Sequence, residues 1–152
     1  MMTIRSNFSQ VMTSLTRKLS EISKPDGAVH NKILRQVASD LIANMHERIH
    51  VEGKATDGSS FGEYSNAYLK RRAENNLSGK KIILRFEGQL EKLTIVANTA
   101  GKISIGWVSD FNGQKAKWME DRYGKIWSLS ESEKEHVKLV ADDVIAEYLN
   151  AQ

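Results

Sequence analysis

The chain is expected to fold as one α+β domain, in which helices come first and a small antiparallel β-sheet comes later. Three observations predict this class. Two apolar stripes with helical spacing fill the first third of the chain, strand-like alternation begins only near residue 94, and a capped apolar stripe closes the sequence. We expect the C-terminal helix to pack on the sheet. The single domain, 1–152, then divides into a helical part, 1–51, an extended loop, 52–66, and an α+β part, 67–152.

Two helices are predicted before any strand. Apolar residues recur at steps of three and four from Phe8 to Ile22, which is typical of an amphipathic helix. The only proline of the chain, in Pro25-Asp26-Gly27, ends this helix. A second stripe runs from Val29 to about Val51, and Gly53 supplies the stop.

Residues 52–66 are polar, contain Gly53, Gly58 and Gly62, and show neither helical nor strand periodicity. We therefore expect a long extended loop. Loops of this length inside a compact domain are uncommon, and many of them are functional or are ordered by a partner. The next segment, residues 66–75, can form a short basic helix.

The strand pattern appears late in the chain. Residues 94–98 and 102–108 flank Thr99-Ala100-Gly101 and predict an antiparallel hairpin. Residues 81–86 could add a strand or lead into a helical turn at 87–93, and residues 116–123 predict one or two helical turns that end at Gly124. Ser130 and Glu133 form a capping-box pattern ahead of the last apolar stripe, so a C-terminal helix is predicted from Ser130.

The composition excludes several classes of protein. With no cysteine among its 152 residues, the chain has no disulfide framework, no cysteine zinc site and no thiol nucleophile. The first residues contain no apolar run long enough for a signal peptide or a membrane span, so no membrane association is expected. A net charge of +3 is too small to indicate a nucleic-acid partner by itself.

One short motif suggests zinc chemistry. His46, Glu47 and His50 match H-E-x-x-H, in which two histidines one helical turn apart bind zinc and the glutamate polarises a zinc-bound water. The third ligand position of the extended motif, however, falls on Thr56. With about 100° per residue, both histidines lie roughly 110–150° from the apolar stripe, on the solvent face. We interpret the match as accidental and predict no catalysis, metal or cofactor; a small zinc metallopeptidase remains an alternative.

A cluster of basic residues gives a third hypothesis, a nucleic-acid-binding module with Tyr68 and Phe86 beside it for base stacking. The same cluster could instead be a solvated surface or face an acidic partner. Its members follow the loop along the chain: Lys70, Arg71, Arg72, Lys80, Lys81 and Arg85. The three tryptophans, Trp107, Trp118 and Trp127, are expected in the core, with a partner surface as an alternative for Trp127.

From the glycine loop onward the sequence resembles a known family. Asp57-Gly58-x-x-Phe61-x-x-Tyr64-Ser65-x-x-Tyr68-x-x-Arg71 is similar to the D-G-x-x-W-x-x-L-S-x-x-[TY]-x-x-[KR] segment of phage virion morphogenesis proteins, the tail completion and head–tail joining (neck) proteins of tailed phages and prophages. Three further blocks follow in the family's order: Leu84 with Gly88-x-Leu90, then Ala116-x-Trp118-x-Glu120-x-x-Tyr123-Gly124, then Ser128-Leu129-Ser130. The resemblance covers roughly residues 29–149 as an order of blocks. Phe61 replaces the usual tryptophan, Glu87 the usual threonine, and Lys125-Ile126-Trp127 a frequent Arg-Pro.

The resemblance implies a structural virion protein without enzymatic activity. Such a protein would form a ring, hexameric in the family, at the end of a tail or at the neck, with itself and other phage tail or neck proteins as partners and with DNA passing through the ring. It would be found in the virion, and in the host cytoplasm during assembly. The loop would then be an arm that reaches a neighbouring subunit through Asp57, Gly58, Phe61, Tyr64 and Tyr68, since buried aromatic side chains tend to dominate interface energetics.

Overall fold

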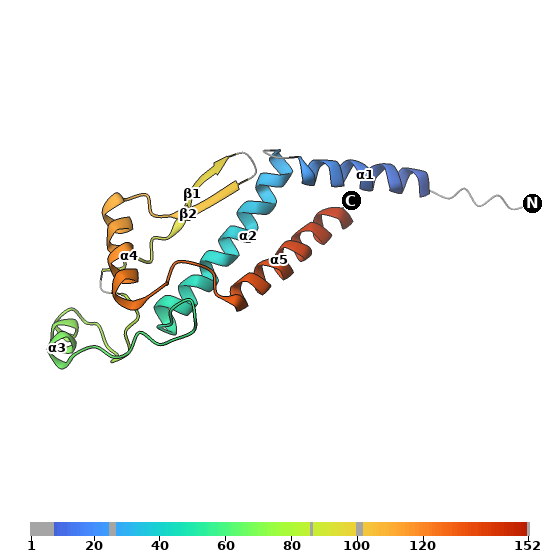
Figure 1. The fold of residues 1–152 in the computed structure, drawn as a ribbon. Coiled ribbons are helices and arrows are strands. Elements are labelled where there is room, and N and C mark those ends of the chain that lie inside the picture. Colours follow the sequence, from blue (N-terminus) through green and yellow to red (C-terminus); the bar gives the residue numbers. More distant parts are fainter. Residues whose placement is uncertain (1–7, 25–26, 86, 100–101, 152) are drawn as a thin grey trace, which may run out of the picture.

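The computed structural model describes residues 8–24, 27–85, 87–99 and 102–151, and these form an α+β fold of helices around one small hairpin (Figure 1). Helix α1 spans Phe8–Ser23 and helix α2 spans Ala28–His46. Pro25 and Asp26 of the predicted breaker lie outside the described residues, whereas Gly27 is the N-cap of α2. The prediction of an α+β class is confirmed.

Helix α2 changes its winding before it ends. Residues Glu47–Val51 form a π-helical turn, η1, in which the amide of Glu52 donates to the carbonyl of Glu47 (2.9 Å). The helical segment therefore reaches Val51, as predicted, but its last turn is wider than an α-helical turn. Gly53 follows with φ +66°, a left-handed conformation that glycine adopts without steric strain.

The hairpin consists of β1, Thr94–Thr99, and β2, Lys102–Gly106, paired antiparallel with an irregularity between Ile95 and Ala97. This matches the predicted hairpin, although Ala100 and Gly101 of its turn lie outside the described residues. Residues 81–85 form neither of the predicted elements; Lys81 makes one isolated bridge with Glu63. Residues 87–93 contain bends and a turn but no helix.

Three further helices complete the chain. Helix α3 spans Asn66–Glu74, which matches the short helix predicted over residues 66–75, and Ser65 is its N-cap. Helix α4 spans Asp110–Tyr123 and begins earlier than expected, because the side chain of Ser109 caps it. Helix α5 spans Glu131–Asn150 and has the predicted capping box: Ser130 Oγ accepts from the Glu133 amide, and Glu133 Oε2 accepts from the Ser130 amide (2.9 Å).

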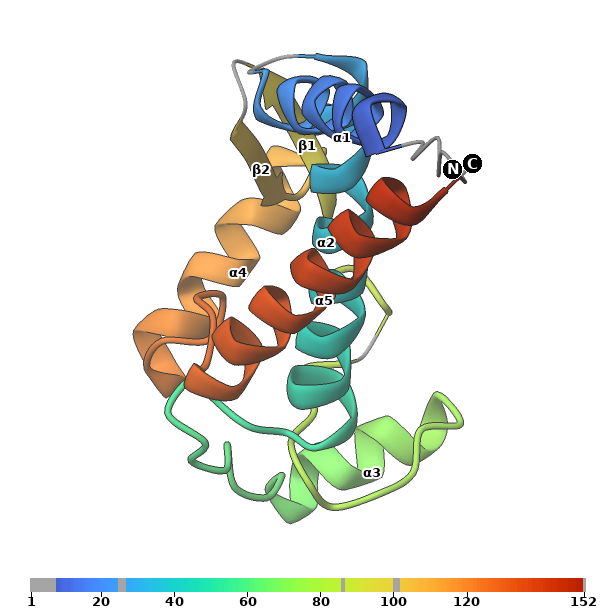
Figure 2. The same cartoon turned by 90° about the vertical axis from the view of Figure 1, so that its right-hand side faces the viewer.

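Helix α2 is the central element of the fold. The prediction that the C-terminal helix packs on the sheet is wrong. The hairpin packs on α2, while α5 packs on α2 and α1, so α2 takes the place expected for the C-terminal helix. Figure 1 shows the hairpin and α4 on one side of α2 and α5 on the other, and Figure 2 shows α5 crossing α2. Near the chain's C-terminal end, Lys18 Nζ of α1 donates to the carbonyl of Leu149 (3.2 Å).

The core lies at the C-terminal end of α2 and includes part of the glycine loop. Its buried members come from α2 and η1, the loop, the segment after α3 and the segment after α4: Leu41, Met45, Ile49, Ala55, Phe61, Ile82 and Ile126. The loop is thus a structural part of the domain. Within the described residues, no helix combines the length and the apolar character that a membrane crossing requires.

Candidate functional site

The H-E-x-x-H residues lie across the junction between α2 and the π turn, and the two histidines have different surroundings. His50 is buried, and its Nδ1 lies 2.9 Å from the carbonyl oxygen of Ile83. His46 is partly exposed, with Nε2 4.0 Å from Glu91 Oε1. The prediction that both histidines face solvent is therefore wrong for His50. The wider π turn changes the direction of the side chains that follow Glu47, so the 100° rule fails beyond this point.

The third ligand position of the zinc motif holds a threonine that bonds elsewhere. Burial of the imidazole lowers the pKa of His50, and its Nδ1 lies against the Ile83 carbonyl, an arrangement that histidines with and without a bound metal share. Thr56, at the third ligand position, uses its hydroxyl in hydrogen bonds with Ser128. Among the residues that the structure describes, no three His, Asp or Glu side chains gather in a way that could hold a metal ion.

Arg48, in the middle of the motif, makes buried contacts with several segments of the chain. Its position in the sequence did not predict these contacts. Its guanidinium is buried and pairs with Glu133, with Nε 2.6 Å from Oε1. The same group donates to the carbonyls of Lys54 (3.1 Å), Ile126 (2.9 Å) and Ser128 (3.1 Å). One side chain thus joins the end of α2, the start of the glycine loop, the α4–α5 connection and the capping box of α5.

The glycine loop is held by its own chain through much of its length. The amide of Ala55 donates to Ser59, that of Phe61 to Gly53, and that of Thr56 to Lys125, at 2.8–3.0 Å. The ring of Phe61 is buried against Tyr123, with 5.4 Å between centroids. The loop is therefore hydrogen-bonded and packed within its own chain, and Phe61, which was expected to reach a neighbouring subunit, is a core residue.

The tip of the loop is exposed and is closed by local hydrogen bonds. Asp57 Oδ1 accepts from the Ser59 amide (2.9 Å) and hydroxyl, and these bonds lower the pKa of Asp57. Gly58 has φ +85° and donates its amide to Ala55. Both residues of the Asp-Gly pair are exposed, so the tip is available to a partner in a fixed conformation.

The aromatic residues after the tip form a stack with one member of the predicted basic cluster. The rings of Tyr64 and Tyr68 lie 5.1 Å apart, and the Arg72 guanidinium lies 4.4 Å from the Tyr64 centroid. Arg72 is only 2% exposed and donates to the carbonyl of Arg85. The prediction of Arg72 as a contact for nucleic acid or an acidic partner is therefore wrong, because its guanidinium is buried between the Tyr64 ring and the Arg85 carbonyl.

The other members of the basic cluster are exposed: Lys70, Arg71, Lys80, Lys81 and Arg85. Arg85 is paired with Glu91, with Nε 3.0 Å from Oε1, which reduces the charge that it presents. The exposed cluster therefore depends mainly on Lys70, Arg71, Lys80 and Lys81.

A groove of about 780 Å³ separates the loop and α3 from α4. Its walls carry the rings of Tyr64, Tyr68, Trp118 and Tyr123 and the cationic groups of Arg85, Lys115 and Arg122, with Glu63 as the acidic group. Lys115 and Arg122 were not among the site residues predicted from the sequence. Their spacing from Phe111 and Trp118, at steps of four, three and four, could have indicated them, because residues so spaced share one face of a helix.

Trp118 and Trp127 differ in exposure. Of these two, Trp127 was the one for which a partner surface was considered. Trp127 packs with its ring edge-on to Trp107 (4.8 Å between centroids), and its Nε1 donates to the Ala116 carbonyl (2.9 Å). Trp118 is 50% exposed on α4. Trp118, rather than Trp127, is thus the tryptophan that offers a surface to a partner.

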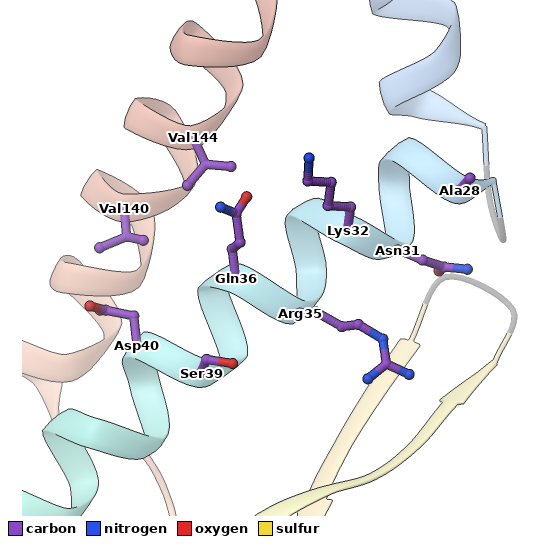
Figure 3. A pocket seen from close by; sticks show the side chains of 9 residues that line it. All are labelled: Ala28, Asn31, Lys32, Arg35, Gln36, Ser39, Asp40, Val140 and Val144. Carbon is purple, nitrogen blue, oxygen red and sulfur yellow. The ribbon is translucent and has the colours of Figure 1, made fainter.

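A second hollow, of about 640 Å³, lies between α2 and α5 (Figure 3). In this view Lys32, Gln36 and Asp40 extend from α2 toward α5, whose Val140 and Val144 supply an apolar wall. Asp40 Oδ2 lies 2.7 Å from His136 Nε2. The hollow is an open seam between two packed helices, and its lining has no nucleophile–base pair.

Comparison with known proteins gives no identification, since no family model, no curated protein and no solved structure matches the chain.

Proposed function

We propose that this chain is a structural virion protein, a tail completion or neck component that forms a ring joining tail to head during phage assembly. It performs no catalysis in this role. Its partners are further copies of itself, in a hexameric ring, and other tail or neck proteins, with DNA passing through the ring. The virion is then its final location, after assembly in the host cytoplasm.

The observation that supports this function best is that the four blocks of the resemblance meet in the fold. Phe61 of the first block packs on Tyr123 of the third. Thr56, next to the first block, donates to the carbonyl of Ser128 in the fourth (3.1 Å).

The second and third blocks meet across the groove, where Leu84 and Leu90 line one part and Trp118 and Tyr123 another. Residues far apart in the sequence that resemble one family in order are thus also neighbours in space. Such packing is expected if the four blocks form one structural unit.

The test of this function is genetic. The coding sequence of this chain is deleted from the genome that encodes it, particle production is induced, and the lysate is imaged by electron microscopy. We expect filled heads and separate tails, with joining restored by the chain supplied in trans. Complete, infectious particles in the deletion strain would contradict the proposed function.

The exposed lysines favour DNA as a partner of the ring. We predict that Lys80→Glu with Lys81→Glu weakens binding of duplex DNA and reduces the slope of log K against log salt by about two, since each lost phosphate contact removes roughly 0.9. Lys134→Glu with Lys138→Glu, an equal change of charge on exposed residues of α5, is the control. Fluorescence anisotropy over a salt series measures the slope. Equal slopes for wild type and the Lys80/Lys81 variant would remove DNA from the list of partners.

A further inference from the structure

Helix α4 presents an apolar and basic face that stays largely exposed among the described residues, and three of its members also line the groove beside α3. Phe111 is 58% exposed and Trp118 is 50% exposed. Lys115 and Arg122 share this face, because the four residues follow one another at steps of four, three and four. Val108, just ahead of the helix, is 85% exposed. Large apolar side chains grouped on one exposed face indicate an interaction surface.

Within the described residues, the two cations of this face have no acidic partner. Lys115 Nζ donates to the Gln89 side chain and lies 4.8 Å from the Phe111 centroid, and the Arg122 guanidinium lies 5.4 Å from that of Tyr123. In the described part of the chain, no carboxylate lies within 4.0 Å of either cation. The exposed acids of α4, Asp110 and Asp121, lie roughly a quarter turn to one side.

Helix α5 presents the opposite charge around an apolar centre. Leu139 is 63% exposed. Glu135, Asp142 and Asp143 precede or follow it by three or four residues and so surround it on the same helix face. Across residues 8–24, 27–85, 87–99 and 102–151, none of these three carboxylates has a cation within 4.0 Å. Lys138, the nearest lysine in sequence, lies roughly a quarter turn away.

One copy cannot bring these two faces together. Helix α4 and helix α5 lie on different sides of α2 (Figure 1), and in the turned view α4 lies to the left of α2 while α5 crosses α2 (Figure 2). Two copies can bring them together, since each molecule carries one α4 face and one α5 face.

We propose that the α4 face of one copy docks on the α5 face of the next copy. Trp118 and Phe111 would cover Leu139, while Lys115 and Arg122 would meet Glu135, Asp142 and Asp143. The two surfaces differ, so the contact is head-to-tail, and it closes a ring when the rotation between copies allows. The inference rests on the proposed function for the biological use of the contact, and it names the surfaces that would form the ring.

Reciprocal charge reversal tests this contact. The first variant carries Lys115→Glu and Arg122→Glu, and the second carries Asp142→Lys and Asp143→Lys. Each variant alone places like charges against each other, so self-association should weaken by about a hundredfold or more. An equimolar mixture restores attraction at both junctions, because the reversed α4 face meets the reversed α5 face and the two unchanged faces meet each other.

Sedimentation velocity over a concentration series, at low salt, measures the association. The control variant carries Lys117→Glu and Lys125→Glu, which change the charge equally at exposed positions outside the α4 face, and it should associate as wild type does. Recovery of association in the mixture also shows that the reversed chains are folded.

Three outcomes would overturn the contact: a wild-type chain that stays monomeric at every concentration, reversed variants that associate as well as wild type, or a mixture that stays dissociated. If the reversed α4 variant alone loses binding to another tail or neck protein while wild type remains monomeric, the occupant of the α4 face is that acidic partner and not a second copy. The genetic test of joining is independent of this one, so either proposal can fail without the other.

Discussion

At the residue scale, Gly53 shows how a single backbone position fixes the path of the loop. Its φ is +66°, and a methyl group there would overlap the carbonyl oxygen of Ile82. Gly58 has a similar φ of +85°, but a methyl group there would meet no atom within 4 Å. Substitution of Gly58 therefore tests the effect of backbone strain alone on stability, whereas substitution of Gly53 tests strain and close packing together.

We predict that Gly53→Ala lowers the free energy of unfolding by at least about 2 kcal/mol, whereas Gly58→Ala lowers it by about 1 kcal/mol, because only the first adds an overlap to the left-handed strain. Urea unfolding of both variants measures the difference. Equal losses would show that the Gly53–Ile82 approach is unimportant.

His50 predicts a pH dependence of stability. Burial lowers its pKa below the ordinary value of 6.5, so the unfolded chain takes up this proton at a higher pH than the folded chain does. The contribution of neutral His50 is therefore complete above about pH 6.5 and decreases as the pH falls through that value toward the folded pKa.

We predict that His50→Gln loses less stability than wild type on acidification from about pH 7.5 to about pH 5. Ile49→Val, a change at a buried neighbour that does not titrate, should keep the wild-type pH dependence. Denaturant titrations across this range measure both slopes, and a His50→Gln slope equal to that of wild type would contradict the assignment.

At the element scale, the Arg48–Glu133 pair couples the end of α2 to the start of α5. Breaking a buried pair by removing one partner leaves a buried charge without compensation. We predict that Arg48→Met lowers the free energy of unfolding by about 3–5 kcal/mol. Lys134→Met, which removes the exposed Lys134–Glu131 pair in the same turn of α5, should have little effect. Urea unfolding measures both variants, and similar losses would contradict a coupling role for Arg48.

Elements with strong local signals could be predicted from the sequence. The Ser130–Glu133 capping box gave the start of α5, and the alternation around Thr99-Ala100-Gly101 gave the hairpin. Helix α4 was predicted only from Ala116, whereas the Ser109 cap starts the helix at Asp110.

The features that the sequence did not reveal depend on tertiary contacts. The π turn that buries His50 has no short-range pattern, and the pairing of Arg48 with Glu133 spans 85 residues. Arg72 likewise resembles its exposed basic neighbours until the fold places it under Tyr64. The outward face of α4 was readable in principle, but its tryptophan suggested core packing.

At the scale of the whole molecule, the fold combines one shared core with exposed surfaces whose apolar and charged side chains are free to meet a partner. The loop, the π turn and the α4–α5 connection share one core, in which Ile49 is 1% exposed and Ile126 is fully buried. The loop tip, the α4 face and the α5 face remain exposed. This arrangement suits a subunit whose partners on either side are further copies of itself.

Native mass spectrometry of the protein purified without chelator, over a concentration series, reads copy number and metal content together and tests the ring most directly. We predict a metal-free closed species with one defined copy number. Monomer at every concentration would contradict a ring that assembles from this chain alone. Stoichiometric zinc that is lost in His46→Ala would contradict the structural role itself and make peptidase assays the next step.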